Sequence, residues 1–390
     1  MVKKKLLLAI VIPLAVVAVA LGVTIPIVIA NNKKKQIPAQ EPTPVQNVVN
    51  DNQTDVVDED NIELIEDKVS IHTALQRDFL NDVKENVNNY ATGTAELSRP
   101  EPAQFTWEGE ASQYTVYLSE QKDYSTSFVY NVEEAKVSFG NLKIDTQYYF
   151  KVLSGENKIK EASFTTSDEI IRNMYVSGVT NVRDLGGYHV DGGVIKQGLI
   201  YRTGRINENS TETLTPKIND KGVFTMLNEM KVKSEIDLRV VENNEVGGLS
   251  EGVGTLGETV HYYQCPMDYT QPFDGEMNDV ALRKVFSILG NENNYPTFFH
   301  CSIGTDRTGY IAWLINACLG VEEENLYRDY LFSNFGNIGS KRTVDTIKGK
   351  YVDLINSYEG VTMKERATNF LLAHGVLQTE IDTLRSIMIG

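Results

Sequence analysis

The chain has 390 residues, of which 41% are hydrophobic and only 11 are proline. A chain of this length is too long for one hydrophobic core of ordinary size. The apolar content excludes wholesale disorder and a collagen-like repeat. The formal net charge of −16 argues against a surface that tracks the phosphates of nucleic acid. The composition therefore predicts a multidomain, mainly globular protein that does not bind nucleic acid.

The first 35 residues are typical of a membrane segment. Lysines occupy positions 3–5 and 33–35, and the stretch Leu6–Ala30 between them carries no charge. A helix of that length spans about 37 Å, which is enough to cross a bilayer core. Residues 1–35 are expected to be a single-pass anchor, with a cleaved signal segment as the alternative. The acidic remainder favours export, so we expect the rest of the chain to lie outside the cytoplasm, membrane-bound or, after cleavage, secreted.

Two segments without evident chemistry follow. Residues 36–70 are rich in Pro, Asn, Gln and acidic side chains and lack a hydrophobic period, which predicts a disordered acidic tether. Residues 71–93 place apolar side chains at helical spacing behind Thr73, which has the chemistry of an N-cap. We expect one amphipathic helix there, ending near Gly93.

Short stretches in which apolar and polar residues alternate predict a small β-sandwich over residues 95–168. Strands are expected at 114–118, 136–139, 148–152 and 162–165. Trp107 behind two prolines, and the spacing Leu142, Thr146, Tyr148, resemble a fibronectin type III module with its tyrosine corner. Trp107 and Tyr148 are then core residues. The segment has no cluster of acids, bases or nucleophiles, so the resemblance implies spacing, or docking to a protein or glycan.

From residue 170 to residue 390, apolar strands alternate with helical patterns, which predicts an α/β domain with a central sheet flanked by helices. The expected strands are 232–238, 261–265 and 297–300, and the expected helices are 281–289 and 307–318. Between the last strand and the last helix lies the run His-Cys-Ser-Ile-Gly-Thr-Asp-Arg-Thr-Gly. The run begins at His300.

This run has the chemistry of a phosphate site with an attached nucleophile. A loop that curls into a helix N-terminus turns its amide groups and the positive helix dipole toward an anion. Arg307 adds a two-pronged grip on phosphate oxygens, and Gly304 permits a tight turn. The same field favours thiolate over thiol at Cys301, to which Thr308 can donate its hydroxyl hydrogen. The predicted phosphate-binding positions are Ser302, Ile303, Gly304, Thr305 and Asp306.

The ten-residue run resembles the cysteine-dependent protein tyrosine phosphatases, in particular the bacterial tyrosine and dual-specificity phosphatases that include secreted, lipid-active members. The resemblance covers about residues 178–390. It implies a hydrolase without cofactor or metal, in which Cys301 attacks phosphorus to give a cysteinyl phosphate that water hydrolyses. Further segments that carry it are Asn181–Gly187, Leu199–Gly204, Ile236–Arg239, Asp329–Leu331 and Phe370–Gly390.

The leaving group needs a proton from a carboxylic acid on a nearby loop. Asp268 is the expected general acid, because the loop 266–269 follows a strand at the place where related phosphatases keep theirs. Three other carboxylates stay open as alternatives, and they are Asp237, Asp274 and Asp306.

Several residues near the motif are expected to support the site. His300 braces the loop by hydrogen bonding, and Asp237 forms a buried ion pair with Arg239. Arg183 and Asp184 either pair as a clamp near the loop or contact substrate.

The chain has three cysteines, so at least one must stay unpaired. Cys318 is expected in the core. Cys265 either packs inertly or meets Cys301 as a resolving thiol.

One departure from the family pattern bears on the substrate. Lipid-active members often have lysine between the glycine and the aspartate of the loop, and here that position is Thr305. Without that cation a multiply phosphorylated headgroup is attracted less strongly, which favours phosphotyrosine in proteins and small phosphomonoesters. A phosphoinositide or inositol phosphate phosphatase, and a catalytically idle phosphate-binding or adhesion protein, are the alternatives.

Overall fold

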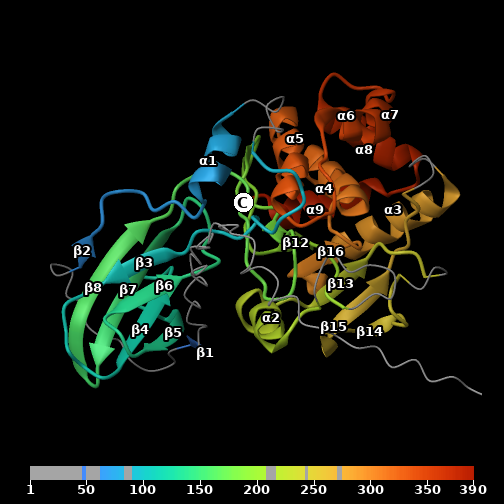
Figure 1. Ribbon diagram of the computed structural model, residues 1–390. Coiled ribbons are helices and arrows are strands. Elements are labelled where there is room, and N and C mark those ends of the chain that lie inside the picture. Colours follow the sequence, from blue (N-terminus) through green and yellow to red (C-terminus); the bar gives the residue numbers. More distant parts are fainter. Residues whose placement is uncertain (1–45, 50–61, 83–89, 208–216, 242–244, 270–274) are drawn as a thin grey trace, which may run out of the picture. The chain divides into compact units, whose positions relative to one another are not determined.

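The computed structural model describes residues 46–49, 62–82, 90–207, 217–241, 245–269 and 275–390 (Figure 1). The chain divides into two units, residues 1–40 and 41–390. The predicted membrane segment lies outside the described residues. Within the described ranges, no helix has both the length and the apolar character needed to span a membrane.

Part of the predicted tether is ordered. Strand β1 (Gln46–Val49) pairs with β5 (Thr126–Val132), and β2 (Glu63–Leu64) pairs with β8 (Asn157–Thr165). The prediction of disorder was therefore wrong for these residues, because their main chains complete the two edges of a sheet. The pairing depends on backbone groups, which leave no trace in side-chain composition.

The helix α1 (Ala74–Asn81) begins as predicted and is shorter than predicted. Thr73 caps it reciprocally with Gln76, each side chain accepting from the other residue's backbone amide. Residues 83–89 lie outside the described residues, and residues 90–93 are not helical.

The predicted sandwich consists of two facing sheets, one with the order β1-β5-β4-β7-β8-β2 and one made of β3 and β6. The four expected strands are present, whereas β3 and β5 were not predicted. Tyr148 is 4% exposed and its hydroxyl accepts a hydrogen bond from the Lys143 amide at 2.9 Å. Trp107 is partly buried against the same core. The bounds are β3 (Ala103–Thr106), β4 (Tyr114–Ser119), β6 (Lys136–Phe139) and β7 (Gln147–Ser154).

The second domain has a mixed sheet with the order β14-β15-β13-β16-β12-β9. Its four central strands are parallel, so their carboxyl ends meet at one edge, where α/β proteins commonly bind ligands. The last of them in the sequence ends at His300, directly before Cys301. The bounds are β9 (Arg183–Asp184), β12 (Ile200–Thr203), β13 (Ser234–Asp237), β14 (Gly252–Gly254), β15 (Gly257–Gln264) and β16 (Thr297–His300). A small hairpin joins β10 (His189–Val190) to β11 (Gly193–Val194).

Helices cover both faces of this sheet (Figure 1). On one face lies α4 (Asp306–Leu319), in which every residue from Arg307 to Leu319 is buried, as expected for a helix that is apolar over most of its length. With it pack α3 (Glu276–Leu289), α5 (Glu323–Phe332), α8 (Met363–Ala373) and α9 (Gln378–Met388). The other face packs on α2 (Asp220–Phe224) and η4 (Thr225–Glu229). Short elements η5 (Glu292–Asn294), η6 (Ser333–Phe335), α6 (Val344–Ile347), η7 (Lys348–Val352) and α7 (Asp353–Asn356) connect the rest.

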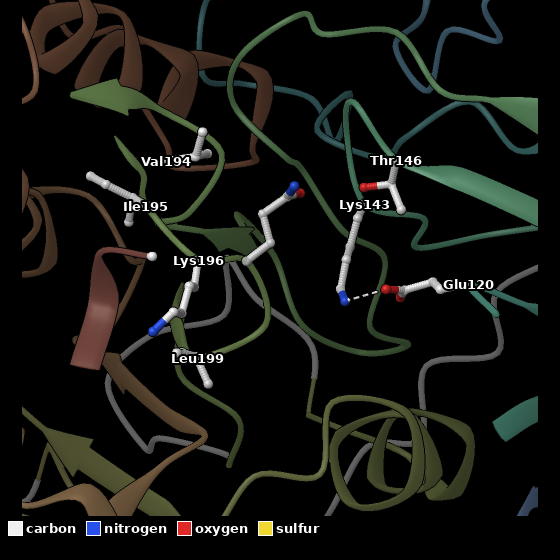
Figure 2. A pocket seen from close by; sticks show the side chains of 9 residues that line it. Glu120, Lys143, Thr146, Val194, Ile195, Lys196 and Leu199 are labelled. Atoms are coloured by element: carbon white, nitrogen blue, oxygen red, sulfur yellow. Dashed lines mark hydrogen bonds and ion pairs between the residues drawn. The ribbon is translucent and has the colours of Figure 1, made fainter. Parts of the chain in front are cut away.

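Nine residues line a groove of about 420 Å³ (Figure 2). Lys143 donates to Glu120 there at 2.8 Å. None of its lining residues belongs to the segment 301–307. They are Glu120, Lys143, Thr146, Val194, Ile195, Lys196, Gln197, Leu199 and Gly390.

Candidate active site

The loop from Cys301 to Thr305 connects β16 to α4, so the nucleophile candidate stands at the edge of the sheet and at the start of a buried helix. Cys301 is 2% exposed. Among the described residues, no side-chain hydrogen bond caps α4 at Thr305. The first amide groups of an uncapped helix have no intrahelical acceptor, and together with the helix dipole they suit an anion.

Gly304 fills a position that requires glycine. Its φ of +70° is left-handed, and a Cβ there would lie 2.6 Å from the carbonyl oxygen of Thr203 at the end of β12. The loop thus turns tightly against the neighbouring strand, as the sequence predicts.

Asn181 and Arg202 hold the outer side of the loop. The Asn181 side-chain amide donates to the carbonyl oxygens of Ile303 at 3.2 Å and Gly304 at 3.0 Å, and Arg202 donates to Gly304 at 2.8 Å. In a trans peptide the carbonyl and the following N–H point to opposite sides. Fixing the two carbonyls outward therefore directs the next two amide groups the other way. Sequence reasoning gave these two side chains no role, although both lie in segments that carry the family resemblance.

A buried ion network backs this arrangement. The Asp329 carboxylate accepts from Arg183 at 3.0 Å and also from Arg202. Asp184 instead pairs with Arg172 at 2.6 Å. Arg183 and Asp184 therefore do not pair with each other, because neighbouring residues of a strand point to opposite faces. Both are at most 2% exposed, and each is engaged by these partners.

Arg307 is 4% exposed, and its guanidinium is already engaged. It pairs with Glu245 at 2.7 Å, approaches Ser302 Oγ at 3.4 Å and lies 4.9 Å from the Tyr269 ring centroid. Sequence reasoning missed Glu245, since a lone acid on a loop gives no signal of its partner. Thr308, by contrast, has a buried hydroxyl without a hydrogen-bond partner in the described part of the chain.

The loop that carries Asp268 lies beside Arg307, because Arg307 also approaches the carbonyl oxygen of Met267 at 3.4 Å. Asn278 fixes the Asp268 backbone, accepting from its amide at 2.9 Å and donating to its carbonyl at 3.0 Å.

The alternatives to Asp268 are differently placed. Asp306 pairs with Arg342 at 2.8 Å, and although burial opposes it, Arg342 lowers the pKa of this carboxyl. Asp237 is fully buried, and despite burial His300 and Arg239 hold its pKa low. Both carboxyls are thus kept ionised, which disfavours a proton donor. Asp274 lies outside the described residues.

His300 lies beneath the nucleophile as a brace. Its Nδ1 is 3.3 Å from the carbonyl oxygen of Cys301 and its Nε2 is 2.9 Å from Glu235. Asp237 forms the predicted buried pair with Arg239 at 2.6 Å. Glu235, Asp237 and His300 could offer ligand atoms within 4.8 Å of one another. Arg239 occupies both oxygens of Asp237, however, so a hydrogen-bonded network fits this cluster better than a cation.

All three cysteines are free and buried. Burial raises the pKa of Cys265 and of Cys318 to about 12, so neither is a ready nucleophile. Cys318 lies in the core as predicted and contacts the carbonyl oxygen of Ile315 at 3.1 Å.

Comparison with known proteins decides the family. The model of the tyrosine phosphatase family matches residues 174–388, which is more than half of the chain. The chain belongs to this family. A protein of Cupriavidus necator named as a tyrosine-protein phosphatase is 25% identical over 216 residues, which are 49% of this chain and 74% of that protein.

Two solved structures resemble parts of the phosphatase. The catalytic core of the PP-IP phosphatase SIW14 from S. cerevisiae is 19% identical and covers 51% of this chain and 98% of its own, with a TM-score of 0.29. TpbA of P. aeruginosa, in complex with pTyr, is 16% identical. It covers 49% of this chain and 86% of its own, with a TM-score of 0.25. Likenesses of this strength carry no argument about substrate. The family match supports a phosphatase enzyme, as the sequence predicts.

Proposed function

We propose that this phosphatase hydrolyses phosphotyrosine and other phosphomonoesters through a cysteinyl-phosphate intermediate. The observation that carries the proposal is the loop itself. Cys301 precedes an uncapped helix start, while Asn181 and Arg202 hold two loop carbonyls outward. The amide groups and Arg307 can then hold the equatorial phosphate oxygens as charge spreads in the transition state.

In the first step the Cys301 thiolate attacks phosphorus. The S–P bond forms, the bond from phosphorus to the ester oxygen breaks, and the leaving oxygen takes a proton from the Asp268 carboxyl. In the second step the Asp268 carboxylate takes a proton from water, whose oxygen attacks phosphorus. Phosphate leaves, and the thiolate returns. The Thr308 hydroxyl, which has no hydrogen-bond partner among the described residues, is suited to donate to the sulfur as it leaves.

Hydrolysis of an aryl phosphate by the full chain in detergent, with chelator present, tests the proposal. We expect turnover that Cys301→Ser abolishes and that Asp268→Asn lowers by roughly 100-fold or more, the usual contribution of a general acid. Retained activity in Cys301→Ser would overturn the proposed reaction. Equal activity in Asp268→Asn would overturn only the choice of acid.

The substrate class is a separate question. Thr305 is fully buried and its hydroxyl lies 3.3 Å from the Asn181 amide, so this position offers no cation to a second phosphate. We therefore propose monoester substrates before phosphoinositides. Hydrolysis rates on a phosphotyrosine peptide and on a phosphoinositide, measured side by side, test this order. A strong preference for the lipid would reverse it.

We also propose that the enzyme is tethered outside the cytoplasm by residues 1–35. The support is the uncharged stretch Leu6–Ala30 between lysines. The hydrogen bond from the Lys143 amide to Tyr148 supports a fibronectin type III-like module that holds the catalytic domain away from the bilayer or docks a partner. Protease added to intact cells should digest the catalytic domain. Protection in intact cells, followed by digestion on lysis, would contradict this location.

A further inference from the structure

Residues 90–98, which we call the strap, pair with the catalytic domain although they precede the family match, which begins at residue 174. The Ile338 amide donates to the Gly93 carbonyl oxygen at 2.9 Å. The Leu97 amide donates to the carbonyl oxygen of Phe335 at 2.6 Å. These main-chain bonds hold the strap in one register on the domain. The reaction proposed above gives the strap no role.

Glu96 is the only acidic residue of the strap, and it is half-buried. One oxygen of its carboxylate accepts from the Thr180 hydroxyl and, at 3.4 Å, from the Asn337 amide. The other oxygen accepts from the Ser98 amide at 3.2 Å and from the hydroxyl of the same residue. An ionised carboxylate accepts at both oxygens, and hydrogen bonds to a charged group are stronger than neutral ones. Glu96 therefore ties the strap to two segments of the catalytic domain.

Thr180 lies directly before Asn181, whose side chain holds the active-site loop. The Thr180 carbonyl oxygen accepts from the Gly204 amide at 2.9 Å, just after β12. Asn181 has a left-handed φ of +61°, which is uncommon for a residue with a side chain. Its side-chain oxygen accepts from Arg183. In this conformation its side-chain amide reaches the two loop carbonyls described above.

The segment that contains Asn337 packs on the same two residues. A Cβ on Gly336 would lie 3.2 Å from Asn181 Cβ and 3.2 Å from Thr180 Oγ1. The Asn337 amide and the Thr180 hydroxyl thus converge on one oxygen of Glu96, beside Asn181. Without that oxygen the two donors would have to find other acceptors, so the segments that carry them would shift.

We propose that Glu96 is a positioning residue for the active-site loop: by accepting from Thr180 and Asn337 it fixes Asn181, whose amide turns two loop carbonyls outward. The inference rests on the proposed function, because it concerns how the loop amides are directed at phosphate. A carbonyl that turned back toward the anion would replace a donor by a repelling oxygen. Glu96 therefore acts on the bound anion through the loop.

Binding of tungstate, a tetrahedral oxyanion, to the full chain in detergent tests the inference without turnover. Glu96→Ala removes the acceptor, and Thr180→Val removes one donor while it keeps the shape of the side chain. We expect each variant to bind tungstate roughly tenfold more weakly, which corresponds to about 1.4 kcal/mol. The kcat on an aryl phosphate should fall in both, because the same amides hold the transition state. Glu101→Ala, which removes an exposed acid just beyond the strap, is the control and should leave the affinity unchanged.

The dependence on Asn181 separates positioning from a general loss of stability. Asn181→Gly keeps the left-handed φ and removes the side chain that holds the loop. In that background Glu96→Ala should weaken tungstate binding by less than about twofold, since effects that share one route are not additive. A further loss of roughly tenfold there would show that Glu96 acts by another route, and it would overturn the inference. Unchanged affinity in both Glu96→Ala and Thr180→Val would overturn it as well.

Failure of the proposed reaction is measured separately, by hydrolysis in Cys301→Ser. Tungstate binding needs no cysteinyl phosphate, so the reaction could fail while the role of Glu96 holds. If the unaltered chain did not bind tungstate, the phosphate site and this inference would both be wrong.

Discussion

At the scale of single residues, Gly304 connects backbone conformation to the proposed phosphate site. Its left-handed φ and the approach to Thr203 leave no room for a Cβ. The sequence already indicates this position, because the glycine lies within the short loop that is predicted to bind phosphate. The ion pair between Arg307 and Glu245 could not be predicted in this way. Nothing in the local sequence around Glu245 indicates a contact with a residue 62 positions away.

Gly304→Ala should weaken phosphate binding and catalysis. A left-handed alanine costs about 1–2 kcal/mol, and relief of the contact with Thr203 must shift the loop amides. We expect kcat/KM on an aryl phosphate to fall by roughly tenfold or more, since about 1.4 kcal/mol corresponds to a factor of ten. Gly349→Ala is the matched control, because a Cβ there meets no heavy atom within 4 Å. Equal activity of the two variants would contradict the assigned role.

At the scale of elements, periodic patterns closely located the strand and the helix on either side of the Cys301 loop. The strand 297–300 matches β16 in full, and the helix predicted from 307 lies within α4. Hydrophobic periodicity reports which face is buried, so it works best for long, strongly apolar segments. It could not find β9, which has two residues, or the link that Asp329 of α5 makes to Arg183 and Arg202. That link depends on charges far apart in the sequence.

Asp329→Asn should destabilise the catalytic domain, because it leaves two buried guanidinium groups without their anion. Breaking a buried pair typically costs about 3–5 kcal/mol in free energy of unfolding. Burial alone would raise the pKa of Asp329, but Arg202 and Arg183 lower it. The carboxylate therefore contributes stability above its unfolded pKa of about 3.9, and that stability is lost as pH falls through the lower folded pKa.

Urea unfolding at several pH values measures this difference. The gap between the original chain and Asp329→Asn should be constant near neutral pH and should shrink in acid. Asp382→Asn removes a carboxylate that is 58% exposed, so it should cost less than about 1 kcal/mol. A gap that widened in acid would contradict the assigned charge state.

At the scale of the whole molecule, a segment far outside the family match completes the catalytic domain. The match begins at residue 174, yet Phe79 of α1 belongs to the same hydrophobic core as Cys301 and lies 5.3 Å from Phe335, centroid to centroid. Farther along the segment, the Gly93 amide donates to Asn334 at 2.8 Å. The helical pattern of residues 71–93 predicts that one face is buried. It cannot say against which domain, because amphipathicity carries no information about the partner.

Phe79→Ala should therefore lower the stability of the catalytic domain. Removing a buried phenylalanine ring costs about 3–5 kcal/mol. The temperature at which phosphatase activity is lost measures the stability of the catalytic domain specifically. We expect this temperature to be lower in Phe79→Ala. Leu75→Ala, on the same helix and 39% exposed, should leave it nearly unchanged. A chain that begins at residue 170 should lose activity at a lower temperature than one that begins at residue 62, because it uncovers Phe332 and Phe335. Equal inactivation temperatures for both pairs would mean that the catalytic domain is stable without the N-terminal segment.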